Sequence, residues 1–302
     1  MDKLEWLKER QCGIGGSDVG AILGVSKYKT AFEVYLEKTE PITEVGEQSE
    51  SAYFGDIFED VVAKEFEKRT GKKVRRDRKH YKHKEYPFMV ANIDRRVVGE
   101  NAILECKTAN QFLSNEWEED EIPASYLLQV QHYLFVTGSE LGYIAVLIGG
   151  QKFIWKEVQK DEELIQMIIE AEKDFWKMIK HKIPPALDGS SAAEKYLNEK
   201  YKDVEEGKSI ELGFEYKDKI KTYLEMKEQL KSFEIEVKEL ENQIKFEIGK
   251  SEYAYAPGYS LSWKKVLSNR VDTKKLKSEY PDVYEKVVKE SISRKFNIKE
   301  DK

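Results

Sequence analysis

The chain has 302 residues, of which 40% are apolar and 36% charged, so it is long enough for one large domain or two ordinary ones. Its formal net charge of −6 excludes a globally basic nucleic-acid binder, so contact with DNA needs a local basic patch or bound metal ions. Only two cysteines are present, Cys12 and Cys106, which excludes a four-cysteine metal site and indicates a reducing compartment. The polar N-terminus and the lack of any long apolar run predict no signal peptide, no membrane span and a cytoplasmic protein.

The N-terminal part of the chain predicts helices separated by turns. Residues 1–10 read as helical and lead into a glycine-rich turn, QCGIGG, after which Ser17 is the predicted N-cap of a short apolar helix. Thr30 and Glu33 have the spacing of a capping box and predict a further helix. Residues 51–70 have apolar side chains near helical spacing and predict a longer amphipathic helix.

The middle of the chain predicts an α/β fold with a mixed central sheet flanked by helices. Residues 141–150 are a nearly continuous apolar run that ends in glycines, as expected of a central strand covered on both faces. The remaining patterns predict strands over 73–76, 79–83, 88–93, 102–107 and 152–158, and helices over 123–137 and 161–182.

A change of character near Pro184 and Pro185 predicts a domain boundary, with an α/β domain over 1–185. Residues 186–302 should form a mostly helical, coiled-coil-like region with a small α/β tail. Its apolar residues follow a heptad spacing at Leu230, Phe233, Val237, Leu240 and Ile244. This seam packs either on its own domain or tail, or against a partner or another copy.

The stretch ILECKTAN (103–110) carries charge within an apolar strand. Side chains alternate along a strand, so Glu105 and Lys107 share one face. Asp94 ends an apolar strand, ten residues separate it from Glu105, and a hairpin would bring the two carboxylates together. Neighbouring carboxylates favour a cation between them, and Mg²⁺ prefers oxygen ligands, to which the Cys106 carbonyl could add. Lys107 would then face the scissile phosphate or the attacking water.

The alternative interpretation of Asp94, Glu105 and Lys107 is a surface hairpin with a salt bridge and no catalytic role. The apolar context of both strands favours a site instead, and so do several blocks elsewhere in the sequence. These blocks are WLKERQCGIGGSDVGAILGVSKYKTAFEVYLEK, FGDIFEDVVAKEFEKRTG and QVQHYLFVTG, which occur in this order over residues 4–155.

Together these motifs resemble the YqaJ-like viral recombinases, relatives of phage lambda exonuclease within the PD-(D/E)xK nucleases. The resemblance implies a PD-(D/E)xK core and a Mg²⁺-dependent exonuclease, with Mn²⁺ as a possible substitute. It implies degradation of one strand of linear duplex DNA in the 5′→3′ direction, leaving 3′ single strands for phage-type homologous recombination. The implied partners are DNA ends, a single-strand annealing protein and further copies in a ring trimer, inside a bacterial host cell.

The resemblance also assigns roles to single residues. Asp94, Glu105 and the Cys106 carbonyl become metal ligands, and Lys107 becomes the catalytic lysine. Glu59 becomes a carboxylate at or near the metal, and Gln131 an active-site polar residue. Arg10 and Ser17 match positions that grip the 5′-terminal phosphate, although taken singly Ser17 could only cap a helix and Arg10 could be a surface cation.

Residues 72–84 form the one strongly basic stretch, KKVRRDRKHYKHK. We expect its side chains to contact the duplex backbone without sequence preference; the alternative is a strand edge protected by charge. The predicted contact residues are Lys73, Arg75, Arg76, Arg78 and Lys79.

Two other functions remain open from the sequence. One is a structure-selective PD-(D/E)xK endonuclease, which would nick closed circles. The other is a non-catalytic module that binds DNA ends or recruits a recombinase, which would bind DNA without cutting it.

Overall fold

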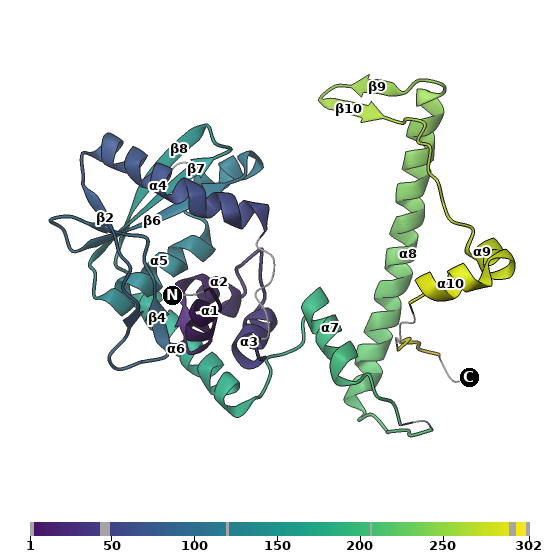
Figure 1. Cartoon of the computed structure of the whole chain (residues 1–302), viewed down its shortest axis with the longest axis horizontal. Coiled ribbons are helices and arrows are strands. Elements are labelled where there is room, and N and C mark those ends of the chain that lie inside the picture. The colour runs from purple at the N-terminus through teal and green to yellow at the C-terminus, as the bar shows by residue number, and fades with distance from the viewer. Residues whose placement is uncertain (1–2, 43–48, 119–120, 206, 290–293, 300–302) are drawn as a thin grey trace. The chain divides into compact units, whose positions relative to one another are not determined.

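The structure is a computed structural model that describes residues 3–42, 49–118, 121–205, 207–289 and 294–299. The chain divides into two compact units, Met1–Glu199 (unit 1) and Lys200–Lys302 (unit 2) (Figure 1). Among the described residues, no helix is long and apolar enough to cross a membrane.

A five-stranded mixed sheet forms the centre of unit 1, in the order β2–β5–β6–β7–β8. The central strands β6 and β7 run parallel, and every other neighbouring pair is antiparallel. The predicted apolar strand near 141–150 is confirmed as β7, which is buried along most of its length. The bounds are β2 (Val74–Arg76), β5 (Arg95–Val97), β6 (Ala102–Ala109), β7 (Leu141–Ile148) and β8 (Lys152–Gln159).

A small second sheet joins the N-terminal segment to the middle of the chain. It contains β1 (Ile14–Gly15), β4 (Met89–Ala91) and β3 (Tyr81–Lys82), with β1 parallel to β4 and β3 antiparallel to it. The prediction of one strand over 88–93 is therefore too long. The chain leaves β4 before Asp94 and then forms the separate strand β5. The sequence pattern did not predict β5 because two of its three residues are arginines, which break the apolar alternation expected of a strand.

Helices cover both faces of the five-stranded sheet (Figure 1). The predicted capping box is confirmed, since Glu33 N–H donates to Thr30 Oγ1 and Thr30 N–H donates to the Glu33 carboxylate. The prediction for Ser17 is wrong: Gly15 is the N-cap, and Ser17 lies in the first turn. The helices are α1 (Lys3–Gln11), α2 (Gly16–Ile22), α3 (Ala31–Thr39), α4 (Glu50–Thr70), the 3-10 helix η1 (Gln111–Trp117), α5 (Ala124–Thr137), α6 (Glu162–His181) and α7 (Ser191–Lys200).

The alternation along β6 decides which side chains meet which helix. Leu104 joins the cluster that packs against Val62 and Phe66 of α4. Ile103 joins the opposite cluster, which includes Val130 and Leu134 of α5. Glu105 and Lys107 share the face of Ile103, so they point toward the α5 side of the sheet.

The compact units divide after Glu199, whereas the sequence predicted separate domains meeting at 185/186. Helix α7 lies mostly in unit 1, where Tyr196 packs edge-on against the buried ring of Phe32. That either part folds on its own stays a prediction.

Unit 2 is built on α8 (Glu215–Ile248), a helix of 34 residues without a single buried side chain. This helix confirms the long helical segment predicted over 214–249. The other elements are the hairpin strands β9 (Tyr253–Ala256) and β10 (Tyr259–Ser262), and the short helices α9 (Thr273–Glu279) and α10 (Pro281–Val287).

Candidate active site

Asp94 is fixed against β6 by a backbone contact. The Cys106 N–H donates to Asp94 Oδ2 at 2.8 Å. On the other side of the same residue, Arg95 Nη1 donates to the Asp94 carbonyl at 2.8 Å. The hairpin β5–β6 thus brings Asp94 beside the strand that carries Glu105 and Lys107, as the spacing predicted.

Glu105 is the buried centre of this cluster, with 3% of its surface exposed. Its Oε1 lies 2.7 Å from Lys107 Nζ and accepts a 2.7 Å hydrogen bond from Gln129 Nε2. Gln129 also donates to the Tyr133 hydroxyl at 3.0 Å. Both Gln129 and Tyr133 lie one turn apart on α5, so this helix supplies the floor beneath the carboxylate.

Burial and mutual repulsion shape the charge of the site. Burial, reinforced by the Glu105 charge, raises the pKa of Asp94 well above its ordinary value. Burial alone would lower the pKa of Lys107, but the carboxylates of Glu105 and Asp94 outweigh it and raise that pKa. The site therefore holds one fixed ammonium beside two carboxylates that disfavour each other's charge.

These residues fit a hard divalent cation. Glu105 Oε2 is buried and has no hydrogen-bond partner in the described part of the chain, an arrangement that is costly without a ligand. A cation between Asp94 and Glu105 would satisfy that oxygen and relieve the repulsion. The Cys106 thiol is unsuited as a ligand, because burial and the Asp94 charge raise its pKa well above the ordinary value, and only its carbonyl could contribute.

Glu59 is not placed with Asp94 and Glu105. Its carboxylate is bound by Arg95 and lies 3.1 Å from Arg76 Nη2, on the α4 side of the sheet. Its charge raises the pKa of Asp94 only weakly, behind that of Glu105. Within the described ranges, no three His, Cys, Asp or Glu side chains are grouped so that they could hold a metal ion together.

Gln131 also lies away from the carboxylates. Its Nε2 donates to the Gln159 carbonyl at 2.7 Å, and its Oε1 accepts from Asp161 N–H at 2.9 Å. It therefore ties the end of β8 to the start of α6. The glutamine that reaches Glu105 is Gln129, two residues earlier; a helical i, i+4 relation between Gln129 and Tyr133 was the signal available in the sequence.

Arg10 and Ser17 do meet. Arg10 Nη2 donates to Ser17 Oγ at 2.6 Å and lies 3.6 Å from Asp18 Oδ1. Asp18 is completely buried and also pairs with Lys38 at 2.8 Å and Lys29 at 3.8 Å. The result is a cationic cluster around one buried carboxylate, with Arg10 and Lys29 at its partly exposed edge.

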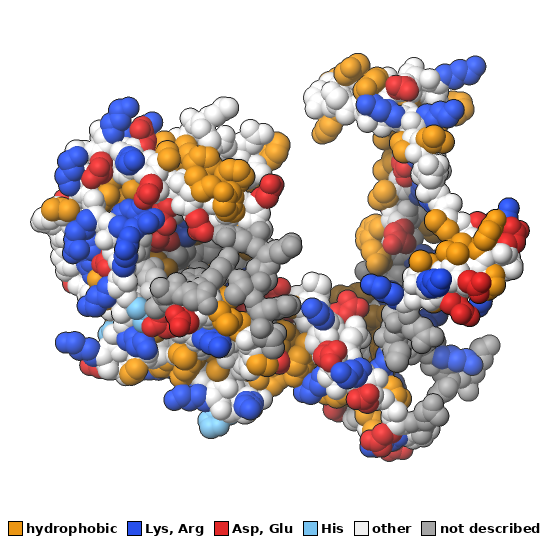
Figure 2. Space-filling view, viewed as in Figure 1, with side chains coloured by type: hydrophobic (Ala, Val, Ile, Leu, Met, Phe, Trp, Pro, Cys, Tyr) orange, Lys and Arg blue, Asp and Glu red, His pale blue; other side chains and the backbone are white. Residues whose placement is uncertain are grey.

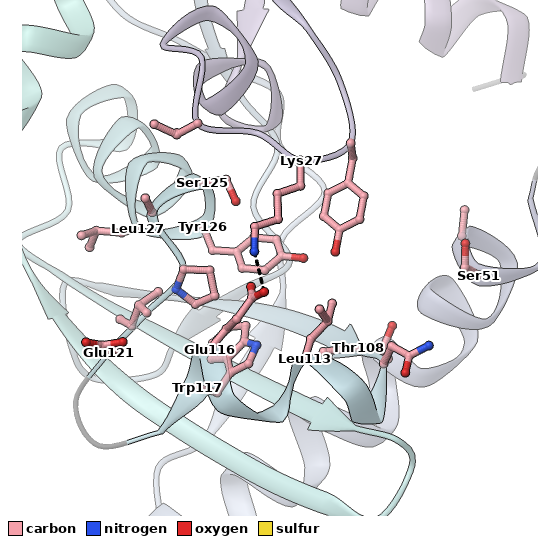
Figure 3. A pocket seen from close by; sticks show the side chains of 18 residues that line it. Lys27, Ser51, Thr108, Leu113, Glu116, Trp117, Glu121, Ser125, Tyr126 and Leu127 are labelled. Atoms are coloured by element: carbon pink, nitrogen blue, oxygen red, sulfur yellow. Dashed lines mark hydrogen bonds and ion pairs between the residues drawn. The ribbon is translucent and has the colours of Figure 1, made fainter. Parts of the chain in front are cut away.

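A pocket of about 900 Å³ is lined by residues of β6, η1 and α5 (Figure 3). Thr108 and Tyr126 line it, and the Tyr126 ring centroid lies 5.2 Å from Lys107 Nζ. Lys27 and Glu116 form an ion pair across its wall at 2.5 Å, while Trp117 closes its floor. The hollow is large enough for several atoms of a nucleotide, and Tyr126 in its wall is the residue that connects it to Lys107.

The predicted basic stretch, residues 72–84, contains the edge strand β2, the loop after it and the short strand β3 of the second sheet. Lys and Arg side chains gather over this side of unit 1 in Figure 2. Arg76 pairs with Glu59, and Lys73 lies 3.9 Å from Glu67 Oε2. Arg75, Arg78 and Lys79 are exposed and form no ion pair with any described residue.

The mixed sheet and its flanking helices form an α/β nuclease fold. The fold resembles the alkaline exonuclease LHK-Exo of Laribacter hongkongensis with a TM-score of 0.50, covering 65% of this chain and 96% of that one at 17% identity. The same exonuclease in complex with dAMP gives a TM-score of 0.50 at 18% identity, with the same coverage. The predicted fold class is confirmed.

The particular family follows from the sequence comparisons. The model of the YqaJ-like viral recombinase domain matches residues 5–140. The uncharacterized protein YqaJ of Bacillus subtilis (strain 168) is 54% identical over 303 residues, covering 99% of this chain and 95% of the relative. The chain belongs to the YqaJ-like viral recombinase family, as its motifs predicted.

Proposed function

We propose that the protein is a divalent-metal-dependent exonuclease that degrades one strand of linear double-stranded DNA in the 5′→3′ direction. The observation that carries this proposal is the half-buried Asp94 and the buried Glu105 beside Lys107, with no described residue bonded to Glu105 Oε2. Family membership and the fold shared with an alkaline exonuclease support the same activity.

Each residue of the cluster has a defined task in hydrolysis. Asp94 and Glu105 hold the metal ion, Mg²⁺ or Mn²⁺, with the Cys106 carbonyl as a further ligand. When bound, the ion would act as a Lewis acid that polarises the phosphate and would lower the pKa of a water molecule bound to it. Lys107 orients the attacking water or stabilises the charge that develops on the phosphate. Gln129 holds the Glu105 carboxylate in one orientation, and Tyr133 in turn accepts from Gln129.

Substrate binding uses two positive regions. Arg10 and Ser17 bind the 5′-terminal phosphate, which sets the polarity of digestion. Lys73, Arg75, Arg76, Arg78 and Lys79 contact the duplex backbone through charge, which suits an enzyme that moves along DNA of any sequence.

The product and the partners follow from this polarity. Digestion of the 5′-ended strand exposes a 3′ single strand, which an annealing recombinase of the phage type would take up in the host cytoplasm. Several copies of the chain act together, for which the family resemblance gives a ring trimer.

The test is digestion of linear duplex DNA with 5′-phosphate or 5′-hydroxyl ends, with closed circular DNA alongside, in Mg²⁺ and in chelator. We expect wild type to degrade the 5′-phosphorylated linear DNA only, and Lys107→Ala or chelation to abolish it. Nicking of the circles would instead identify a structure-selective endonuclease. DNA binding without any cutting would identify an end-binding module.

A further inference from the structure

Helix α8 presents an apolar seam that no described residue of its own unit buries. Every residue of the helix is at least partly exposed. The six side chains of the seam are each between 47% and 64% exposed, and hydrophobic side chains lie bare along α8 in Figure 2. The seam consists of Met226, Leu230, Phe233, Val237, Leu240 and Ile244.

The spacing of the seam is that of a coiled coil rather than of a helix packed on a globular core. Its steps alternate between four and three residues from Met226 to Ile244, so it fills six consecutive a and d positions of a heptad. A strict a/d seam is narrow and suits one partner helix of the same kind. Most helical stability in proteins comes from the packing of an apolar face, so a 34-residue helix with no buried face gains from such a partner.

The tail of unit 2 covers a different part of α8. Its contacts fall near the two ends of the helix, where Phe296 meets the Tyr223 ring and Trp263 lies under Lys245. The partly buried apolar residues of α8 also lie toward its ends, at Ile220, Leu224 and Ile248. The central seam is left open for another molecule.

We propose that α8 pairs with α8 of a second copy of this chain in an antiparallel coiled coil. In this arrangement each a residue of one copy faces a d residue of the other. Leu230 then packs on Leu240, Phe233 on Val237, and Met226 on Ile244, and each pair occurs twice by symmetry. All six layers are apolar, with none interrupted by a polar or charged side chain.

The charged residues that flank the seam favour the antiparallel orientation. Antiparallel pairing places Lys227 of one copy beside Glu241 of the other, and this pair occurs twice. It also places Glu234 beside Glu234 of the other copy and Glu236 beside Glu236, once each. Parallel pairing places Glu236 beside Glu241 twice and offers no attractive pair. The two Lys–Glu pairs therefore favour the antiparallel arrangement over the parallel one.

The first experiment is sedimentation equilibrium of the full chain over a range of concentrations, comparing Val237→Lys with Ile235→Lys. Both changes replace a β-branched residue on the same helix, but Ile235 lies off the seam and is itself 54% exposed. We expect wild type to self-associate, Val237→Lys to raise the dissociation constant by at least about tenfold, and Ile235→Lys to leave it within about twofold. Circular dichroism shows whether each variant keeps its helix.

A charge swap tests the orientation. Lys227→Glu replaces the like-charged i, i+4 pair of Lys227 and Lys231 by a favourable Glu–Lys pair, so the charge change does not weaken the helix itself. We expect it to weaken association by opposing Glu241, and Glu241→Lys added to it to restore association. A monomeric wild type, equal effects of Val237→Lys and Ile235→Lys, or no effect of Lys227→Glu would each overturn the proposal.

Discussion

Replacing Asp18 by Asn should remove the charge on which the N-terminal cationic cluster depends. The carboxylate is completely buried, and Lys38, whose side chain is 2% exposed, lies 2.8 Å away. Asn keeps the volume and can still accept from Gly15 N–H, which donates to Asp18 at 3.1 Å. It leaves the buried Lys38 ammonium without the carboxylate that lies 2.8 Å from it, and removes the same charge from beside Arg10 and Lys29.

The magnitude follows from this geometry. A unit charge pair 2.8 Å apart attracts by about 6 kcal/mol at an effective dielectric constant of roughly 20. Removing one partner of a buried pair typically costs about 3–5 kcal/mol, because the other charge stays buried. Since Asn retains the hydrogen bonds, we expect a loss of about 3 kcal/mol in the free energy of unfolding at pH 7.

The same residue predicts a pH dependence. Burial alone would raise the pKa of Asp18, but Lys38, Arg10 and Lys29 outweigh it and hold the pKa below the ordinary value of 3.8. The ionised carboxylate therefore stabilises the fold at every pH above 3.8, and this contribution is lost as pH falls through the lower pKa of the folded state. The difference between wild type and Asp18→Asn should stay constant from pH 7 to about pH 5 and shrink below 3.8.

The assay is urea unfolding followed by near-ultraviolet circular dichroism, because four of the five tryptophans lie in unit 1. Glu37→Gln is the matched control: its carboxylate pairs with Lys29 at 2.5 Å but is 51% exposed, so its loss should cost less than about 1 kcal/mol. Equal losses for the two variants would refute the reasoning that burial makes the Asp18 pair strong.

Four further predictions concern the site and the basic stretch. Gln129→Leu should lower the single-turnover rate of DNA cleavage by about 10–100-fold through the freed Glu105 carboxylate. Gln131→Leu should instead leave that rate unchanged and lower the free energy of unfolding in urea by about 1–3 kcal/mol, since two backbone groups lose their partner. If Gln131→Leu lowered the cleavage rate and Gln129→Leu did not, Gln131 would be the glutamine of the active site. Mg²⁺ or Mn²⁺ should raise the melting temperature of wild type but not of Glu105→Gln, in the absence of DNA; an equal rise in both would argue against Glu105 as a ligand. Arg75→Gln combined with Arg78→Gln should lower the slope of log K for duplex DNA against log salt by roughly 2, whereas Lys177→Gln on the far helix α6 should leave the slope unchanged.

Much of this fold is determined by local sequence rules. The capping box at Thr30, the long helix ended by Gly71 in the left-handed conformation and the apolar run of β7 each depend on a few neighbouring residues. The same holds for Glu105 and Lys107, because the period of a strand places them on one face whatever surrounds it. The exposed heptad of α8 could likewise be read directly from the spacing of its apolar residues.

The tertiary structure decided which of the polar residues meet. Gln129 rather than Gln131 reaches Glu105 because the rotation of α5 on the sheet is set by the packing of its apolar face, to which both residues are adjacent. Glu59 is bound by Arg95 because β5, a strand concealed by its charged residues, carries that arginine to the α4 side. Asp18 became the centre of an ion-pair cluster only because α1, α2 and α3 bring Arg10 and Lys38 to it. Local periodicity fixes the direction of a side chain, whereas its partner depends on the packing of distant segments.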